Sequence, residues 1–390
     1  MQPVDLSADF ARLSDWERLI SFPVAERRWP TRGGQDAPRE SARVTLERLL
    51  LPAVTQPPCY ILFSGGRDSS SLLGVATLVA RRAGADDPVP VTVVHPDAPR
   101  TDESQWQSTV LSHLGLAHRI VLESRGDQSL LSPDAQAALG RHGLVWPEAL
   151  QVHGFVLGQL PTGTVVMGEG GDDTLGNRRV SPLWRVLRAR RLRRADAGPV
   201  VGALAPRAAH RGWARRRVER AGLLAWLRPP HRDRALRDLA AGTSEPLRWD
   251  RAVAGSLLRR PARILRQNLE TTIAEYGHRP VNPFLDQEFA LALAATGGPV
   301  GLGDRTTMMR RLFGDLLPPA VLGRQDKAAF GDTRWGSVER DFARSWSGAG
   351  LGDEVDPEVL RAAWLSDFPP PGAAFLLHAA WLASVDGATA

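Results

Sequence analysis

Hydrophobic and polar positions change in blocks along the first half of the chain, and each block predicts one element. Short runs of apolar, β-prone residues favour four strands, at 59–63, 89–95, 118–122 and 164–167. Apolar residues at helical spacing favour helices between them, at 69–83, 102–115 and around 149–160. The first strand is apolar on both faces, as in a strand buried within a parallel sheet. The alternation of strands and helices predicts an α/β fold, a parallel sheet flanked by helices.

The second half of the chain shows no strand pattern after Asp172, so we expect it to be mostly helical. Asp356-Pro357-Glu358 is typical of a helix start, and 375–385 is amphipathic at helical spacing. These patterns divide the chain into a short N-terminal segment at 1–57 and one domain at 58–390. We subdivide that domain into an α/β core at 58–177, an arginine-rich helical insertion at 178–245 and a helical completion of the site at 246–390.

The predicted first strand breaks into the sequence Ser-Gly-Gly-Arg-Asp-Ser-Ser, residues 64–70, before the first helix. At a helix N-terminus, unpaired N–H groups and the helix dipole favour an anion, and glycines let the backbone approach it closely. The chain lacks the Gly-x-x-x-x-Gly-Lys-Ser/Thr pattern of a Walker loop. The alternative is a glycine-rich turn whose Asp68 caps the helix. We favour a pyrophosphate-binding loop formed by Ser64, Gly65, Gly66, Asp68, Ser69 and Ser70.

Four segments of the chain, in order, resemble the motifs of one family. The loop at 64–70 is similar to the PP-loop of ATP pyrophosphatases, which cleave ATP between its α- and β-phosphates. Residues 168–173, Gly-Glu-Gly-Gly-Asp-Asp, are similar to the Gly-Glu-Gly-x-Asp-Glu motif of the asparagine synthetase-like branch, with Asp173 where Glu is usual. Residues 283–286 resemble its Pro-Phe-Leu-Asp element and 324–327 its Arg-x-x-Lys element. The resemblance implies the fold of the adenine nucleotide α-hydrolases and the use of ATP and Mg²⁺.

The resemblance also implies a reaction and a role for each residue. A substrate carboxylate attacks the α-phosphorus, pyrophosphate leaves, and an amine converts the acyl-adenylate into an amide and AMP. Asp68 and Asp172 match the aspartates that coordinate Mg²⁺, Lys327 the lysine that neutralises charge in both steps, and Glu169 the general base. Glu169 could instead orient a loop N–H group or a substrate ammonium. The backbone of Leu62 and Val94 matches the adenine contacts, and Gly168 and Gly170 complete the second loop.

One position departs from the family pattern. The family often has a second lysine in a later helix, and Thr306 takes that position here, beside Arg305. We therefore expect pyrophosphate release either to depend on Arg305 or to proceed differently from the family pattern. The pair Asp102-Glu103 resembles a family pair that opens the second helix, although capping of that helix explains it equally well.

Lys327 is the only lysine among 49 basic residues. A lysine ammonium is a compact charge and a guanidinium is a planar fork, so the two do not substitute for each other at a crowded phosphate. A surface lysine left by chance is the alternative, but its position within Arg-x-x-Lys favours a role in catalysis.

Amino-acid composition indicates the compartment of the protein. A single cysteine, Cys59, excludes a disulfide within the chain and favours a reducing compartment. No signal peptide and no apolar run long enough for a membrane are evident, so we expect a cytoplasmic protein.

Charge is distributed unevenly along the chain. Residues 178–237 contain eighteen arginines and three acidic residues, which gives a local charge of +15 in a chain of net charge +6. This arginine block favours an anionic partner or forms a solvated helical insertion, and we expect its tryptophans, 184, 213 and 226, to lie in a core.

The sequence leaves the amine and the carboxylate open. Asparagine synthetases carry an N-terminal glutaminase domain with a cysteine nucleophile, whereas residue 2 here is Gln2, so we expect no glutamine hydrolysis. Segments 275–279, 304–318 and 379–383 resemble lasso peptide macrocyclases and β-lactam synthetases, which use an amine of the substrate itself. We expect a peptide or amino-acid-derived substrate, with a precursor-binding or protease partner, and neither nucleic acid nor a membrane. The alternatives are an ammonia-dependent amidotransferase, a tRNA-modifying enzyme and an inactive peptide-binding scaffold.

Overall fold

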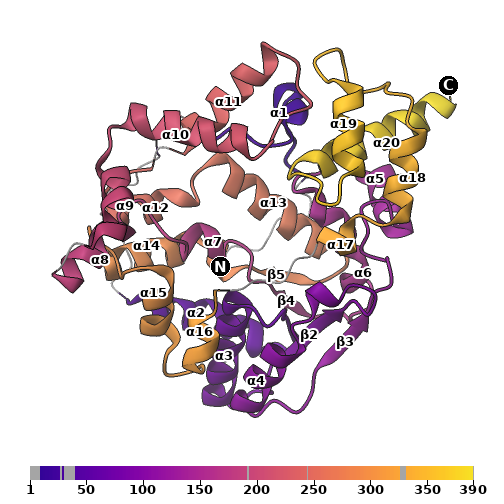
Figure 1. Cartoon of the computed structure of the whole chain (residues 1–390). Helices are drawn as coiled ribbons and strands as arrows, with labels where there is room; N and C mark the ends of the chain where they lie inside the picture. Colours follow the sequence, from indigo (N-terminus) through magenta and orange to yellow (C-terminus); the bar gives the residue numbers. More distant parts are fainter. Residues whose placement is uncertain are drawn as a thin grey trace.

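A five-stranded parallel sheet forms the centre of the α/β part (Figure 1). This computed structural model describes residues 9–26, 29, 40–190, 193–243, 245–325 and 331–389. The strands follow the order β3-β2-β1-β4-β5, and every neighbouring pair is parallel. They comprise β1 (Cys59–Leu62), β2 (Val89–Val94), β3 (Ile120–Glu123), β4 (Thr164–Val166) and β5 (Arg279–Val281). The predicted parallel α/β fold is confirmed.

Strand β5 is a correction to the sequence analysis, which expected no strand after Asp172. It has three residues, and Pro280 is one of them, so neither length nor residue type marked it as a strand. It pairs with β4 at the edge of the sheet, with Val166 opposite Val281. This pairing places the Pro-Phe-Leu-Asp element, which follows directly, beside the end of β4.

The helices that flank the sheet begin and end where local chemistry dictates. Helix α3 (Arg67–Ala83) starts after Gly66 and ends at Gly84, whose φ of +66° is the left-handed conformation typical of a helix end. Its inner face buries Leu72, Val75 and Ala76 in the main core. The helix expected around 149–160 is instead a 3-10 turn, η3 (Glu148–Val152), followed by the single turn α6 (Gly154–Leu157). Gly154 and Gly158 lower the helix propensity of this segment.

The rest of the chain is helical in the part that the structure describes, apart from β5. Asp356 caps its helix by accepting hydrogen bonds from Glu358 and Val359, as the sequence predicts. The remaining helices are α1 (Asp15–Ile20), α2 (Ala42–Val54), η2 (Pro99–Thr101), α4 (Ser104–Leu114), α5 (Pro133–His142), α7 (Gly171–Thr174), α8 (Ser181–Ala189), α9 (Arg194–Leu204), α10 (Arg207–Arg220), α11 (His231–Gly242), α12 (Trp249–Ser256), α13 (Arg260–Glu275), η4 (Pro283–Leu285), α14 (Gln287–Gly297), α15 (Arg305–Phe313), α16 (Pro319–Gly323), α17 (Gly331–Arg334), α18 (Ser337–Ser345), α19 (Pro357–Leu365) and α20 (Ala373–Thr389).

A second hydrophobic cluster holds the two ends of the described chain together. It joins α1, α5, α11, α18, α19 and α20 around Trp226, Trp346 and Trp364. Figure 1 shows α1 near α19 and α20, and α8 to α10 as an arch on the far side. The expectation that the three tryptophans of the arginine block lie in a core holds for Trp226 but is wrong for Trp213, which is 44% exposed. None of the described helices is long and apolar enough to cross a bilayer.

Candidate active site

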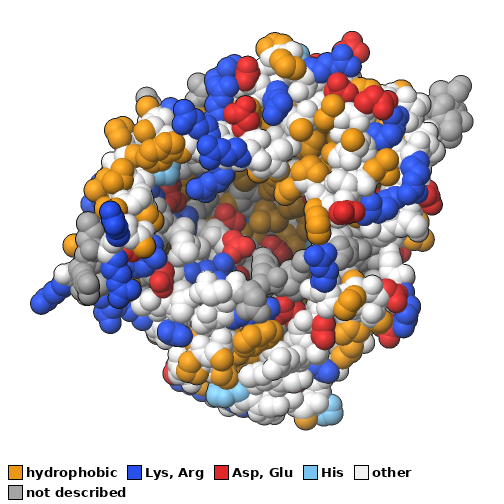
Figure 2. Space-filling model, viewed as in Figure 1, with side chains coloured by type: hydrophobic (Ala, Val, Ile, Leu, Met, Phe, Trp, Pro, Cys, Tyr) orange, Lys and Arg blue, Asp and Glu red, His pale blue; other side chains and the backbone are white. Residues whose placement is uncertain are grey.

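A cleft of about 710 Å³ opens where the carboxyl ends of β1, β2 and β4 meet the helical half. In open α/β sheets, ligands bind at this edge. Figure 2 shows the hollow in the middle of the molecular face, below the arch of helices α8 to α10. Both glycine-rich loops predicted from the sequence line this cleft.

The first loop is held open by its own hydroxyl groups. Ser64 N–H donates to Ser69 Oγ at 3.3 Å, and Gly66 N–H donates to Ser64 Oγ at 3.3 Å. Gly65 has a φ of +84°, and a Cβ atom there would lie 3.0 Å from the Gln107 side chain of α4. Since α3 begins directly after Gly66, the loop presents the N-terminus of a long helix to the cleft. This backbone fits a phosphate group.

The second loop packs directly on the first. A Cβ atom at Gly168 would lie 3.3 Å from Ser69 N, and one at Gly171 would lie 2.6 Å from Asp68 Oδ2. Gly170 has a φ of +84°, which a residue with a side chain rarely adopts. The absence of side chains at these glycines therefore brings Asp172 to the same rim as Asp68.

Arg305 bridges the two aspartates. Its Nη2 donates to Asp68 Oδ1 at 2.8 Å and to Asp68 Oδ2 at 2.6 Å, and its Nη1 donates to Asp172. Although burial opposes the charge of Arg305, the Asp68 carboxylate and then Asp172 raise its pKa. Helix α15 begins at Arg305. The backbone N–H of Arg305 donates to Asn177 Oδ1, so the backbone that carries this side chain is fixed.

The two carboxylates that Arg305 joins, Asp68 and Asp172, could also bind a divalent cation. Mg²⁺ is held by one or two carboxylates together with phosphate oxygens. Asp68 and Asp172 offer two carboxylates on adjoining loops, and in this structure a cationic side chain lies between them. The donor set therefore fits Mg²⁺, and Arg305 holds the place that the metal ion would take. Within the described residues, no group of three or more His, Cys, Asp or Glu side chains forms another candidate metal site.

Arg67 is a cation that the sequence analysis did not assign. Its Nη1 donates to Thr306 Oγ1 at 3.3 Å, so a guanidinium from the first loop reaches the position where the family often has its second lysine. Burial and the neighbouring charge of Arg305 lower the pKa of Arg67. Two guanidinium groups beside one phosphate-binding loop favour a polyanionic ligand. The signal for Arg67 was its place within the loop, but contact with Thr306 depends on the tertiary fold.

A buried ion pair connects the first loop to the chain that leads toward Lys327. Arg324 forms two hydrogen bonds with the Glu103 carboxylate, and both side chains are buried. Arg324 Nη1 also donates to the Gly65 carbonyl at 3.4 Å, and its guanidinium lies 4.9 Å from the centre of the Trp106 ring. Lys327 itself lies outside the described residues, so its role stays a prediction.

The structure gathers most of the predicted site residues in the cleft. Those that line it are Leu62, Ser64, Gly66, Asp68, Ser69, Gly168, Glu169, Gly170, Asp172 and Arg305. Three others do not line it. Gly65 packs against Gln107, and Ser70 is fully buried, with no hydrogen-bond partner for its Oγ. Val94 does not line the cleft, whereas Val91, Val93 and His95 do, because side chains alternate between the two faces of a strand.

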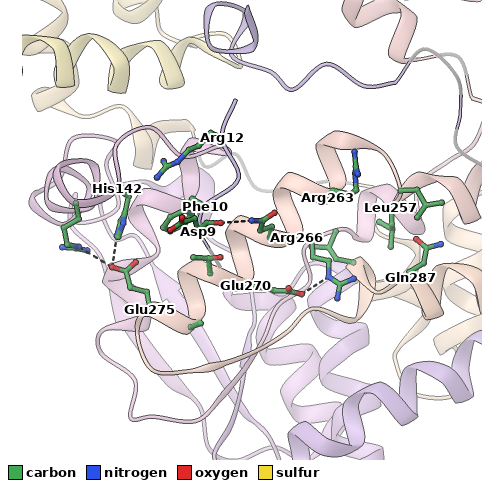
Figure 3. Close-up of a pocket in the computed structure, with 16 residues that line it drawn as sticks. Asp9, Phe10, Arg12, His142, Leu257, Arg263, Arg266, Glu270, Glu275 and Gln287 are labelled. Atoms are coloured by element: carbon green, nitrogen blue, oxygen red, sulfur yellow. Dashed lines mark hydrogen bonds and ion pairs between the residues drawn. The ribbon is translucent and has the colours of Figure 1, made fainter. Parts of the chain in front are cut away.

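A second pocket, of about 720 Å³, lies along helix α13 (Figure 3). Its polar groups largely pair with one another. His142 Nε2 lies 2.8 Å from Glu275 Oε1, Arg266 Nε donates to Glu270 at 2.9 Å, and Gln267 donates to the Asp9 carbonyl. It lacks both glycine-rich loops and the carboxyl ends of the strands. The cleft at the sheet edge is therefore the candidate active site.

The comparison with known families agrees with this geometry. A family model described as asparagine synthase matches residues 51–369, which include the sheet, both loops and Arg305. No protein of curated function matches the chain.

Proposed function

Because this chain belongs to the asparagine synthase family of ATP-dependent ligases, which form amides by adenylation, we propose that it activates a substrate carboxylate in the cleft and releases AMP and pyrophosphate. One observation carries the proposal. The two glycine-rich loops converge at the carboxyl ends of the strands and place two carboxylates and a guanidinium side by side.

The chain's own groups would bind the nucleotide as follows. The N-terminus of α3, which the first loop presents to the cleft, would contact the phosphates, and Asp68 and Asp172 would hold Mg²⁺. When bound, Mg²⁺ would neutralise charge on the phosphate oxygens. The guanidinium groups of Arg67 and Arg305 stabilise the pyrophosphate leaving group, since preorganised cations supply most of the catalysis in phosphoryl chemistry.

The reaction has two steps. A carboxylate oxygen of the substrate bonds to the α-phosphorus while the bond between the α-phosphorus and the oxygen bridging to the β-phosphate breaks. An amine then bonds to the acyl carbon while the bond between that carbon and the AMP oxygen breaks, and Glu169 accepts the proton that the amine loses. Glu169 lines the cleft directly after the strand β4. Lys327 would neutralise charge in both steps.

We further propose that the amine belongs to a peptide or amino-acid-derived substrate, as in macrocyclases, and that the helices α8 to α10 capture it. Apolar side chains lie open to solvent there, with Leu187 66%, Val201 62% and Leu204 58% exposed. Within the described part of the chain, Arg190 and Arg194 pair with no acidic group. Exposed apolar groups beside unpaired arginines suit an acidic peptide with apolar residues.

The arch proposal is tested by the charge reversals Arg190→Glu and Arg194→Glu, with Arg119→Glu, an exposed arginine outside the block, as control. We expect KM for a peptide substrate to rise, its salt dependence to weaken and kcat to change little, because this binding is remote from the chemistry. If KM and its salt dependence were unchanged and the protein bound tRNA tightly, the tRNA-modifying alternative would replace the peptide ligase.

The reaction is tested by mass spectrometry with candidate precursor peptides from the same gene neighbourhood, Mg²⁺ and ATP. We expect a product that has lost one water, formed together with stoichiometric AMP. Asp68→Asn and Asp172→Asn should each abolish adenylation with the fold intact, whereas Asp353→Asn, at an exposed position away from the cleft, should not. ADP as the stoichiometric product would refute the proposal, and a product formed only with added ammonia would favour an ammonia-dependent amidotransferase.

A further inference from the structure

Gln107 is a buried polar side chain at the cleft that the proposed reaction leaves unused. It lies in helix α4, is 5% exposed and lines the cleft. Its side-chain Nε2 donates a hydrogen bond to the Ser64 carbonyl at 3.3 Å. Its backbone N–H donates to the Glu103 carbonyl at 2.9 Å, which fixes the backbone that carries the side chain. Helix α4 therefore holds a donor against the backbone of the first loop.

The first loop passes close to α4 at Gly65. A Cβ atom there would lie 3.0 Å from Gln107 Cγ, 3.3 Å from Gln107 N and 3.4 Å from Trp106 Cβ. The close approach and the φ of +84° both favour glycine at this position. A residue without a Cβ atom adopts either sign of φ with little cost, so Gly65 does not by itself fix the direction of the peptide groups beside it. That direction depends on the donors that hold the carbonyls.

Side-chain donors on other elements hold the two carbonyls of this stretch. The Ser64 carbonyl accepts from Gln107, and the Gly65 carbonyl accepts from Arg324 Nη1 at 3.4 Å. Arg324 is in turn held by two hydrogen bonds with the buried Glu103 carboxylate. Of the two donors, Gln107 is the uncharged one, so its replacement by an uncharged residue leaves the charge of the site unchanged.

The direction of the Ser64 carbonyl fixes the rest of its peptide group. The bond between Ser64 and Gly65 is trans. In a planar trans peptide the carbonyl and the N–H point in opposite directions, so the Gly65 N–H points away from α4. Ser64 lines the cleft. If this peptide group turned over, its carbonyl oxygen, which carries partial negative charge, would point away from α4 toward the phosphates and repel them.

From these contacts, and resting on the proposed function, we propose that Gln107 is a positioning residue for the pyrophosphate part of ATP. It acts through the backbone of the first loop, because its amide keeps the Ser64 carbonyl turned toward α4. The loop then presents N–H groups and the N-terminus of α3 to the phosphates, with no carbonyl oxygen among them. Glycine gives the loop its close approach, and Gln107 removes the freedom that glycine brings.

The test compares the two proposed products, pyrophosphate and AMP, as ligands in isothermal titration with Mg²⁺. Pyrophosphate reports on the first loop, whereas AMP lacks the leaving group that this loop would bind. Gln107→Met keeps the length of the side chain and removes its donor. We expect this variant to bind pyrophosphate about tenfold or more weakly than the wild type, since one hydrogen bond to a charged group contributes about that much. AMP should bind as it does to the wild type.

A matched control and a second variant separate positioning from folding. Gln105→Met makes the same change at an exposed position of the same helix, and it should bind both ligands as the wild type does. Thermal unfolding of Gln107→Met shows whether the fold is retained. If Gln107→Met does not fold, Gln107→Asn replaces it. This variant keeps an amide but is shorter by a methylene group, so it should not reach the Ser64 carbonyl and should show the same selective loss.

Different results would overturn different claims. If either product failed to bind the wild type, the proposed function would be refuted. If both bound the wild type and folded Gln107→Met kept its affinity for pyrophosphate, the role of Gln107 alone would be refuted. An equal loss of affinity for pyrophosphate and AMP would also refute that role, because it would indicate a general structural defect.

Discussion

Removal of the guanidinium between the two aspartates should make the protein bind Mg²⁺ more tightly in the absence of nucleotide. In the structure, a metal ion must displace Arg305 from Asp68 and Asp172 before it can bind them. Arg305→Met removes this competitor and leaves two neighbouring carboxylates without a cation. The same variant should bind pyrophosphate more weakly, because it lacks a cation for the leaving group.

The size of the effect follows from the exposure of the two pairs. The side chains of Arg305 and Asp68 are 16% and 23% exposed, so their hydrogen bonds are worth about 1.5–3 kcal/mol. Asp172 is 66% exposed, and an exposed pair adds about 1 kcal/mol or less. Together these contributions amount to about 1.5–4 kcal/mol, so Mg²⁺ affinity should rise by about 10- to 1,000-fold in Arg305→Met.

Isothermal titration of Mg²⁺ into nucleotide-free protein measures this change. Arg311→Met is the matched control, since Arg311 lies on the same helix but points to Trp184 and is exposed. Arg305→Lys should give an intermediate affinity, because one ammonium cannot span both carboxylates as a guanidinium does. An Mg²⁺ affinity in Arg305→Met equal to or below that of the wild type would show that the bridge does not compete with the metal ion.

Two further predictions concern catalysis and stability. Lys327→Arg should lower the rate by about 10²-fold in steady-state assays despite the retained charge, since a planar fork displaces the reacting groups, and near-normal activity would show that the only lysine is incidental. The buried Glu17 has its pKa lowered to about 2, because hydrogen bonds from Arg260 and from backbone N–H groups outweigh the effect of burial. This group stabilises the fold above its unfolded pKa and loses that effect as the pH falls toward 2. In Glu17→Gln, the free energy of unfolding should therefore fall by about 1–2 kcal/mol less on acidification than in the wild type, after allowance for screening. An acid denaturation curve in Glu17→Gln that matched the wild type would contradict this assignment.

The features predicted from sequence were those with local causes. The strands β1 to β4 are apolar runs, and the first loop follows from glycines and hydroxyls placed between a strand and a helix. The features that were missed depend on contacts between distant segments. Arg67 meets Thr306 across 239 positions, and no pattern near either residue indicates the contact.

The buried pair between Glu103 and Arg324 has an evolutionary consequence. Loss of one partner of such a pair leaves an unpaired charge and costs about 3–5 kcal/mol, whereas replacement of both by apolar residues is often neutral. Arg324 also donates to the Gly65 carbonyl, so a substitution of either partner would disturb the first loop as well as lower stability. Selection should therefore remove either single change and tolerate the double change. Across related sequences, we expect an acidic residue at 103 and an arginine at 324 to be inherited or lost together.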